Sequence, residues 1–391
     1  MNREQGRALV GISLSQLLLL SLWMSSAAVG PRLQDAWGLT AGQVAGLTMA
    51  VQLGFVVGSA GLIVSGLADL LPTRRLFALS ALVALAANVS LVLLDRNQFS
   101  LALMLRLATG IGLAGGYPSA LKAVAGWFRD DLGSATGWLI GALTVGAGIP
   151  YLVASLDLGW QQILVVASGL AGTGAIIMLV LVRDGPFDPP PVRVSLSHLR
   201  RVVTDRKVRL ISIAYFGHNW ELFALWTWIG VFLAASARAG GQSEGWTPVV
   251  AFASIAAGGA GAWAAGRWSD RYGRIPVARL ALIISGGASL LTPVVFGLSA
   301  PIVAFFFVVW GIAVVADSPL FSVMVTEAAD ETTRGTALTL QLAVGFLVPL
   351  ITIGMVPALA DLWSWRYAFV ILAAGPLVAI IALNRLETSD A

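Results

Sequence analysis

The chain has 391 residues, of which 58% are hydrophobic and only 11% are charged. Soluble domains have roughly 25% charged residues, so this composition excludes a water-soluble fold. The formal net charge is +4, and cysteine is absent, which excludes disulfides and thiolate metal sites. The 43 Gly and 14 Trp residues are typical of a helical membrane protein, in which glycine lets helices pack closely and tryptophan lies at the membrane interfaces.

Twelve apolar stretches are long enough to cross a bilayer, which takes roughly 20 helical residues. They cover residues 8–30, 41–67, 76–94, 100–125, 133–156, 160–182, 209–236, 247–267, 277–298, 301–325, 334–359 and 365–385. We therefore predict an all-α polytopic membrane protein with twelve transmembrane helices. The first stretch follows Arg3 and Arg7 and could pass for a secretory signal, but we expect it to be retained as the first span.

The distribution of Lys and Arg predicts the orientation, because short loops rich in these residues stay preferentially in the cytoplasm. With both termini inside, eighteen of the 24 Lys and Arg residues fall in inner segments and four in outer loops. The other two, Arg106 and Lys122, lie within spans. This bias predicts an integral protein of the plasma (inner) membrane of a bacterium, with both termini in the cytoplasm.

One long polar connection follows the sixth span, and its prolines at positions 186 and 189–191 exclude it as a span. Its last part, residues 195–209, is basic and amphipathic, as expected of a helix that lies on an anionic membrane surface. We predict an N-terminal six-helix bundle over residues 1–182, a cytoplasmic linker with this amphipathic segment over 183–208, and a C-terminal six-helix bundle over 209–391.

The two predicted bundles repeat one another. Asp69 and Asp270, each at the start of a basic loop, are 201 residues apart, and Pro118 and Pro319 in the fourth and tenth spans are separated by the same 201 residues. A parallel repeat of six helices is the architecture of alternating-access transporters, whose site lies near the membrane midplane. The spacing therefore predicts two pseudo-symmetric six-helix bundles.

Residues 266–274 read Gly-Arg-Trp-Ser-Asp-Arg-Tyr-Gly-Arg, which fits the loop signature G-x-x-x-D-R-x-G-R of the major facilitator superfamily. A degenerate copy over residues 65–75 has Leu70 where the family has arginine. The chain resembles that superfamily over nearly its whole length. The resemblance implies cytoplasmic gating loops, in which a carboxylate and arginines form a latch that must break during transport. The residues concerned are Asp69, Arg74, Arg75, Gly266, Asp270, Arg271, Gly273 and Arg274.

In this latch, Asp270 is expected to pair with Arg271 and Arg274, and Asp69 more weakly with Arg74 or Arg75. The alternative is that the arginines only set the topology. Arg106 and Gly110 resemble the family's R-x-x-x-G pattern, which is associated with proton-coupled members. The fifth span has no Gly-Pro pair, and the second and eighth spans lack an arginine pair, so the drug-antiporter and nitrate branches are disfavoured.

Four charged residues and one histidine lie within the predicted spans, where a charge costs roughly 2.5–3.5 kcal/mol on insertion scales and is a functional candidate by default. Arg106 and Lys122 can attract an anion, or can extend to the membrane surface instead. Sixteen residues separate them, which places them about 160° apart on a straight helix. Gln52 and Asn88 are predicted to make hydrogen bonds between helices.

The seventh span places His218, Glu221 and Trp228 on one helical face, where the first two can share a proton. A structural hydrogen bond between helices is the alternative for this pair. Asp317 corresponds to Gly116 by the 201-residue offset, and Gly116 is followed by Tyr117. The predicted substrate- and proton-binding residues are Arg106, Tyr117, Lys122, His218, Glu221, Trp228 and Asp317.

No phosphate-binding G-x-x-x-x-G-K-[ST] loop occurs, so ATP is not the visible source of energy. We expect secondary active transport by alternating access, with a small organic anion or metabolite carried in symport with protons. The alternatives are proton-driven efflux of amphipathic, drug-like compounds and a non-transporting sensor with the same fold. We expect no enzyme, no catalytic residue, no metal and no cofactor. The expected partners are the solute, protons and the lipid bilayer, without nucleic acid, and the monomer is expected to function.

Overall fold

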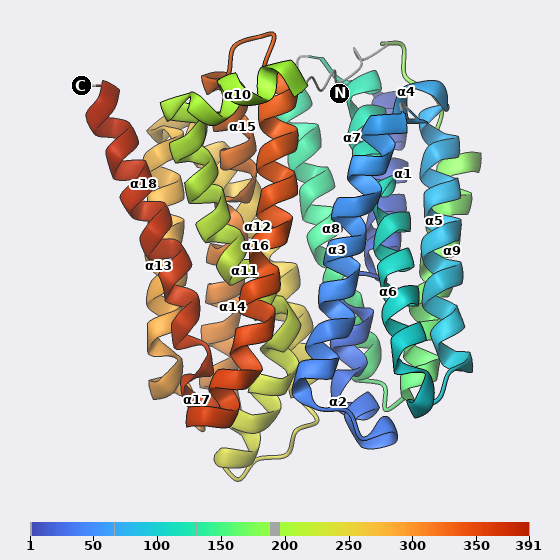
Figure 1. Cartoon of the computed structure of the whole chain (residues 1–391), viewed down its shortest axis with the longest axis vertical. Helices are drawn as coiled ribbons and strands as arrows, with labels where there is room; N and C mark the ends of the chain where they lie inside the picture. The colour runs from blue at the N-terminus through green and yellow to red at the C-terminus, as the bar shows by residue number, and fades with distance from the viewer. Residues whose placement is uncertain (1, 66, 130, 188–195, 391) are drawn as a thin grey trace. The chain divides into compact units, whose positions relative to one another are not determined.

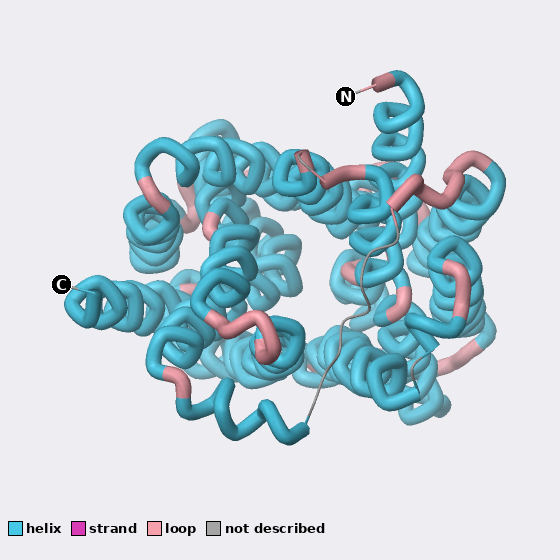
Figure 2. The backbone as a smooth tube through the Cα atoms, turned by 90° about the horizontal axis from the view of Figure 1, so that it is seen from above, coloured by secondary structure: helices cyan, strands magenta, loops and turns pink. Residues whose placement is uncertain are grey.

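The computed structural model describes residues 2–65, 67–129, 131–187 and 196–390, with only the backbone of residues 68, 69, 196–198, 389 and 390. These residues form helices joined by loops, and no strand occurs among them (Figure 2). Twelve of their helical segments are long and apolar enough to cross a membrane. The prediction of an all-α protein with twelve membrane-spanning helices is confirmed.

The first six spans are followed in chain order from blue to green in Figure 1. Three of them consist of more than one helix. The helices are α1 (Arg3–Leu20), α2 (Ser25–Trp37), α3 (Ala41–Ser65), the short α4 (Leu67–Leu70), α5 (Thr73–Ser90), η1 (Leu91–Leu93), η2 (Arg96–Gln98), α6 (Phe99–Ala114), α7 (Gly116–Trp127), α8 (Leu132–Ala154) and α9 (Trp160–Val180).

The remaining helices begin within the predicted linker. They are α10 (Leu196–Thr204), α11 (Arg206–Ala239), α12 (Thr247–Tyr272), α13 (Arg274–Val295), α14 (Ala300–Ala316), α15 (Ser318–Ala328), α16 (Arg334–Trp363), α17 (Trp365–Ala368), η3 (Val370–Ala373) and α18 (Ala374–Asp390). Part of the predicted linker, residues 188–195, lies outside the described residues.

Two of the spans break at related positions because each contains a proline. Pro118 and Pro319 have no N–H group, so each leaves a carbonyl of the preceding turn without its helical hydrogen bond. The helix is interrupted just before each proline, at Gly115 between α6 and α7 and at Asp317 between α14 and α15. The first residues of α6 and α14, 99 and 300, and the last residues of α7 and α15, 127 and 328, both differ by 201. The sequence repeat is therefore a repeat of structure.

The chain divides into two compact units. Unit 1 comprises Met1–Pro190 and Gly245–Gly259, and unit 2 comprises Pro191–Glu244 and Ala260–Ala391. The predicted boundaries at residues 182 and 208 stay a prediction. Within unit 1, α1 packs against α8 and α9, and α5 against α6 and α9. Within unit 2, α11 packs against α15, α16 and α18.

Glycine allows α3 and α6 of unit 1 to pack with their backbones in contact (Figure 1). A Cβ atom on Gly110 would lie 2.1 Å from the carbonyl oxygen of Val51, and one on Gly54 would lie 2.0 Å from that of Leu107. No larger side chain fits at these distances. Close helix packing therefore explains the glycine at position 110, which the sequence pattern associated with proton coupling.

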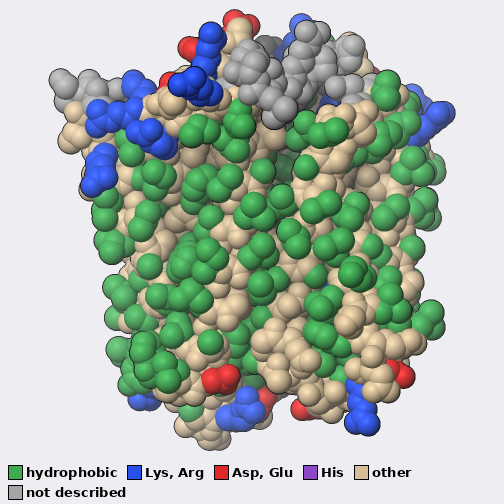
Figure 3. All heavy atoms as spheres, viewed as in Figure 1, with side chains coloured by type: hydrophobic (Ala, Val, Ile, Leu, Met, Phe, Trp, Pro, Cys, Tyr) green, Lys and Arg blue, Asp and Glu red, His purple; other side chains and the backbone are tan. Residues whose placement is uncertain are grey.

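The helix surfaces match a lipid environment. On the face that Figure 3 shows, hydrophobic side chains cover the middle of the helices, and Lys, Arg, Asp and Glu side chains gather near their ends. Exposed apolar residues include Leu79 and Leu82 of α5 and Phe305 of α14. Inside the spans, Arg106, His218, Glu221 and Asp317 are buried instead, and they define the candidate site.

Candidate functional site

The first buried polar cluster lies in unit 2, where α11 meets the break between α14 and α15. His218 of α11 and Asp317 at the break are each about 2% exposed, and His218 Nδ1 lies 2.8 Å from Asp317 Oδ1. The distance is that of an ion pair, although the imidazole N–H does not point straight at the oxygen. The break holds Asp317 in place, because its backbone carbonyl accepts from the N–H groups of Leu320 and Phe321 at the start of α15.

Aromatic rings fix the orientation of this imidazole. Tyr215, one turn earlier on α11, stacks on His218 with ring centroids 5.9 Å apart and 25° between the planes. Phe321 of α15 contacts it at the same centroid distance in a tilted arrangement. The other ring nitrogen, His218 Nε2, is buried and has no hydrogen-bond partner among the described residues. The pair therefore presents one nitrogen that a solute or a proton can use.

The second cluster surrounds Glu221, one turn further along α11. Three donors converge on its carboxylate: Ser285 Oγ donates to Oε2 at 2.9 Å, Ser289 Oγ donates to Oε1 at 3.0 Å, and Trp310 Nε1 donates to Oε1 at 2.7 Å. An ionised carboxylate accepts all three hydrogen bonds. If Oε2 takes up a proton, the Ser285 hydroxyl can accept it and turn its own hydrogen to the carbonyl of Leu282 at 3.4 Å. The cage accommodates both protonation states.

The prediction that His218 and Glu221 act on each other directly needs correction. His218 is paired with Asp317, and the hydrogen bonds to Glu221 come from α13 and α14. The role of Trp228 in substrate binding stays a prediction. Its single N–H group donates to the carbonyl of Ile353 at 2.9 Å, and its ring packs on Trp365, so its polar group is already used.

A third cluster lies in unit 1 around Arg106, which is fully buried. The carbonyls of Leu22 and Trp23 lie in the turn between α1 and α2, and the guanidinium donates to both, with Trp23 O at 3.1 Å. It also donates to Ser25 Oγ at 3.1 Å and to Asn88 Oδ1 at 2.6 Å. Arg106 therefore does not extend to the membrane surface. Its hydrogen bonds connect the broken first span to the neighbouring helices, and its described acceptors are all neutral.

Asn88 and Gln52 were each predicted to make a hydrogen bond between helices. Asn88 makes the expected hydrogen bonds between helices, since it also donates to Ser168 Oγ at 3.0 Å. The prediction is wrong for Gln52, whose buried amide has no partner among the described residues.

Tyr117 and Lys122 do not extend the Arg106 cluster. The break at Gly115 separates α6, which carries Arg106, from α7, which carries both other residues. Tyr117 is half-buried, and Lys122 lines a cavity at the end of unit 1 together with Arg74. The structure thus places the two cationic candidates of the fourth span, Arg106 and Lys122, in different surroundings.

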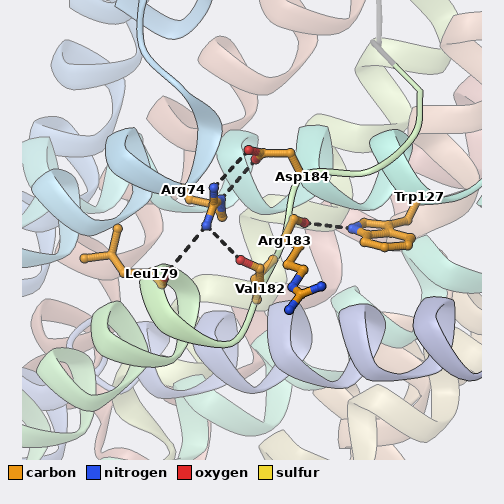
Figure 4. A network of polar contacts seen from close by, with 6 residues as sticks. All are labelled: Arg74, Trp127, Leu179, Val182, Arg183 and Asp184. Atoms are coloured by element: carbon orange, nitrogen blue, oxygen red, sulfur yellow. Dashed lines mark hydrogen bonds and ion pairs between the residues drawn. The ribbon is translucent and has the colours of Figure 1, made fainter.

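In the first gating loop, Arg74 has an ion-pair partner that was not predicted. Arg74 forms a two-pronged ion pair with Asp184, with Nε to Oδ1 at 3.1 Å and Nη2 to Oδ2 at 3.0 Å (Figure 4). It also donates to the carbonyl of Val182, just past the end of α9. Arg75 is exposed, and the side chain of Asp69 lies outside the described residues. The described partner of Arg74 is therefore Asp184, which follows the sixth span.

The second gating loop also has an ion pair that was not predicted. Arg274 forms an ion pair with Glu327 of α15, and Arg271 lies over the ring of Tyr272 at 5.3 Å. Asp270 is exposed, and no ion pair joins it to another residue in the described part of the chain. Gly273 has φ +86°, a conformation open to glycine and strained for other residues, which explains this glycine of the signature. Gly266 is half-buried on α12.

Sequence reasoning missed Ser285, Ser289 and the role of Trp310. The two serines are four residues apart on α13, a spacing that places them on one helical face. No feature of the sequence relates that face to Glu221. Among the described residues, no three His, Cys, Asp or Glu side chains are grouped to hold a metal ion.

Internal helix repeats with broken spans and buried charges define the architecture of a secondary transporter. The family model described as Major Facilitator Superfamily matches residues 12–262 and 211–389. The chain belongs to the major facilitator superfamily, and it is an integral membrane transporter, not an enzyme.

Solved structures of other transporters share the fold. A bacterial homologue of the human lysosomal transporter Spinster, in an inward-facing and occupied conformation, aligns with a TM-score of 0.73 at 15% identity, over 100% of this chain and 97% of that one. A variant of the nucleoside transporter NupG aligns with a TM-score of 0.76 at 14% identity, over 97% of this chain and 99% of that one.

A curated relative is the gentisate transporter of Corynebacterium glutamicum, which is 26% identical over 153 residues. The match covers 39% of this chain and 34% of that protein, so about a third of the relative's length is matched.

Proposed function

We propose that this transporter carries a small organic anion in symport with protons, by alternating access. The observation that carries the proposal is the buried pair of His218 and Asp317, in contact at 2.8 Å at the break of the tenth span. A histidine side chain can both take up and release a proton, and a carboxylate beside it stabilises its charged form. Such a group is what proton coupling requires.

We propose that the proton and the anion are coupled at His218. When both ring nitrogens of His218 carry a proton, Nδ1 faces Asp317, and the buried Nε2–H is free to donate to a solute carboxylate. When His218 is neutral and Nδ1 keeps the hydrogen, Nε2 carries a lone pair that repels the anion. The anion therefore binds after His218 has taken up a proton, and release of that proton weakens the binding of the anion.

The class of solute is supported by the gentisate transporter, because gentisate is an aromatic carboxylate. The rings of Tyr215 and Phe321 around His218 provide an apolar surface of the kind on which an aromatic solute packs. Aromatic carboxylates are thus the first candidates. Efflux of amphipathic compounds driven by protons is the alternative, and the aromatic residues suit it too.

The test uses purified protein in proteoliposomes that contain a pH-sensitive dye. Aromatic carboxylates, aliphatic carboxylates, organic cations and hydrophobic drugs are added outside. The proposal predicts that an aromatic carboxylate acidifies the lumen as it enters. Trp228→Phe, which removes the hydrogen bond to the Ile353 carbonyl and part of the packing on Trp365, should give the same signal. Entry without a pH change excludes proton symport. Proton movement opposite to a hydrophobic drug would establish the efflux alternative.

We also propose the orientation with both termini in the cytoplasm of a bacterial plasma membrane, as the distribution of Lys and Arg predicts. The absence of cysteine makes the test direct, because a single introduced cysteine is the only thiol. A cysteine at Arg3 should be protected from an impermeant maleimide in intact cells, and one at Arg96 should react. The reverse pattern would invert the topology.

A further inference from the structure

Two buried polar side chains of unit 1 lack hydrogen-bond partners at the break of the fourth span. The amide of Gln16 on α1 is fully buried, and neither its oxygen nor its nitrogen has a partner among the described residues. The hydroxyl of Ser119, in the first turn of α7, is also buried and has none there. Most buried polar groups in native proteins are paired, so each exception calls for an explanation.

The Gln16 side chain is directed at the break between α6 and α7. A Cβ atom on Gly116, the first residue of α7, would lie 3.9 Å from Gln16 Oε1. Gly116 therefore faces the Gln16 amide, in agreement with the packing of α1 against α7. Ser119 follows Gly116 by three residues, a spacing that places both on one face of the helix. The unpartnered amide and hydroxyl thus lie where α1 meets the start of α7.

This arrangement repeats the position of the pair formed by His218 and Asp317 in unit 2. Gly116 and Asp317 are 201 residues apart and lie at corresponding breaks, and Gln16 and His218 are 202 residues apart. In unit 2, His218 of α11 contacts Asp317. In unit 1, Gln16 of α1 approaches Gly116. Each unit places a polar side chain of its first span at its broken span, and this side chain is titratable in unit 2 and neutral in unit 1.

The backbone on both sides of Gln16 is held by close helix contacts. A Cβ atom on Gly146 of α8 would lie 2.1 Å from the carbonyl oxygen of Leu17, and one on Gly174 of α9 would lie 2.7 Å from that of Ser15. No larger side chain fits at these distances, so glycine is needed at both positions. Two helices thus fix α1 at the residues that flank Gln16, and its amide is positioned before a ligand arrives.

We propose that Gln16 and Ser119 bind a hydroxyl group of the transported solute. The amide offers N–H donors and a carbonyl acceptor, and the serine hydroxyl both donates and accepts. A carboxylate accepts only and leaves Gln16 Oε1 without a partner, whereas a hydroxyl can donate to that oxygen and accept from Ser119. The inference rests on the proposed function, since it takes the solute to be a small organic anion, and it adds a hydroxyl to the chemistry of that solute.

The test measures binding of benzoate, 3-hydroxybenzoate and 4-hydroxybenzoate to the purified full chain by isothermal titration calorimetry. Wild-type protein should bind at least one hydroxybenzoate about fivefold to tenfold more tightly than benzoate, as one added hydrogen bond provides. Gln16→Leu should abolish this preference, and Ser119→Ala should reduce it, while Ser119→Thr keeps a hydroxyl and should retain it. Ser15→Ala is the matched control, because the Ser15 hydroxyl already donates to the Gly11 carbonyl at 2.8 Å.

Thermal unfolding of the same variants without ligand separates ligand binding from a structural role. Because the Gln16 amide has no partner in the described part of the chain, Gln16→Leu should unfold at or above the wild-type temperature. The inference is overturned if wild-type protein prefers neither hydroxybenzoate, or if folded Gln16→Leu keeps the preference. If Gln16→Leu does not fold, Ser119→Ala decides, and an unchanged preference overturns the inference.

The proposed function is judged by a separate readout, the luminal pH of proteoliposomes. Entry of benzoate without a pH change contradicts proton symport and leaves the comparison of binding affinities intact. Acidification by benzoate, together with equal binding of benzoate and both hydroxybenzoates, supports symport and overturns the hydroxyl site.

Discussion

Replacing Glu221 separates a proton-binding role from a structural one. Glutamine has nearly the shape of glutamate but cannot take up a proton at neutral pH. Its oxygen can accept from Trp310 and Ser289 as Oε1 does now, and its NH₂ group can donate to Ser285. The three contacts survive as neutral hydrogen bonds, which are weaker, but the cost of burying a charge disappears. We expect Glu221→Gln to change the free energy of unfolding by only about 1 kcal/mol.

Alanine at the same position should have a much larger effect. Trp310 is fully buried, so its N–H would face neither an acceptor nor water, at a cost of about 1–3 kcal/mol. The one methylene group that is lost, Cγ, adds about 0.8 kcal/mol. The serines lose less, because Ser289 already reaches the carbonyl of Ser285 at 3.2 Å. We expect a loss of about 2–4 kcal/mol for Glu221→Ala, within the range measured for large-to-small core substitutions.

The assay for both variants is thermal unfolding in detergent, followed by transport in proteoliposomes. Glu221→Gln should unfold close to the wild-type temperature and yet lose accumulation driven by a proton gradient. Glu221→Ala should unfold several degrees lower. Equal destabilisation by both variants would refute the hydrogen-bond reasoning and show that the charge itself holds the fold. Normal accumulation by Glu221→Gln would remove Glu221 from the proton pathway.

Three further substitutions test other contacts. Arg106→Met removes the guanidinium donor from the Trp23 carbonyl at the first-span break and from Asn88 Oδ1, and should lower stability by about 2–4 kcal/mol in the same thermal assay; unaltered unfolding would contradict its structural role. Gly110→Ala would place Cβ 2.1 Å from Val51 O, so the helices must separate, and we expect a loss of about 1–3 kcal/mol. Asp270→Asn should change the transport rate of a fully folded protein, because Asp270 is exposed; unchanged kinetics would remove the latch.

Spanning helices could be predicted from sequence because hydropathy over 20 residues is a local signal. The ends of these helices could not be placed, because a helix can continue through polar residues that do not raise its mean hydropathy. The first span was expected at residues 8–30 and extends over Arg3–Trp37, beginning where the Asn2 side chain caps α1. The interruptions at Gly115 and Asp317 follow from the nearby prolines, Pro118 and Pro319, whose 201-residue spacing is visible in the sequence.

Partners across helices were the part that sequence could not provide. The residues His218 and Asp317 were both identified as buried titratable groups, but they are 99 positions apart in the chain, and helical spacing pointed to Glu221 as the partner instead. Their contact depends on how α11 packs against the broken tenth span. The partner of Arg74 is another example, since Asp184 follows the sixth span, far from the loop that the family signature marks.

The measurement that tests the central claim most directly compares driven accumulation with exchange in Asp317→Asn. Asparagine fills the same space beside His218 but cannot balance its positive charge, so the imidazole should no longer hold its proton through the cycle. We expect the variant to exchange labelled aromatic carboxylate across a membrane without a gradient, and to fail to accumulate it when a proton gradient is imposed. Accumulation equal to wild type would contradict proton coupling through the pair of His218 and Asp317.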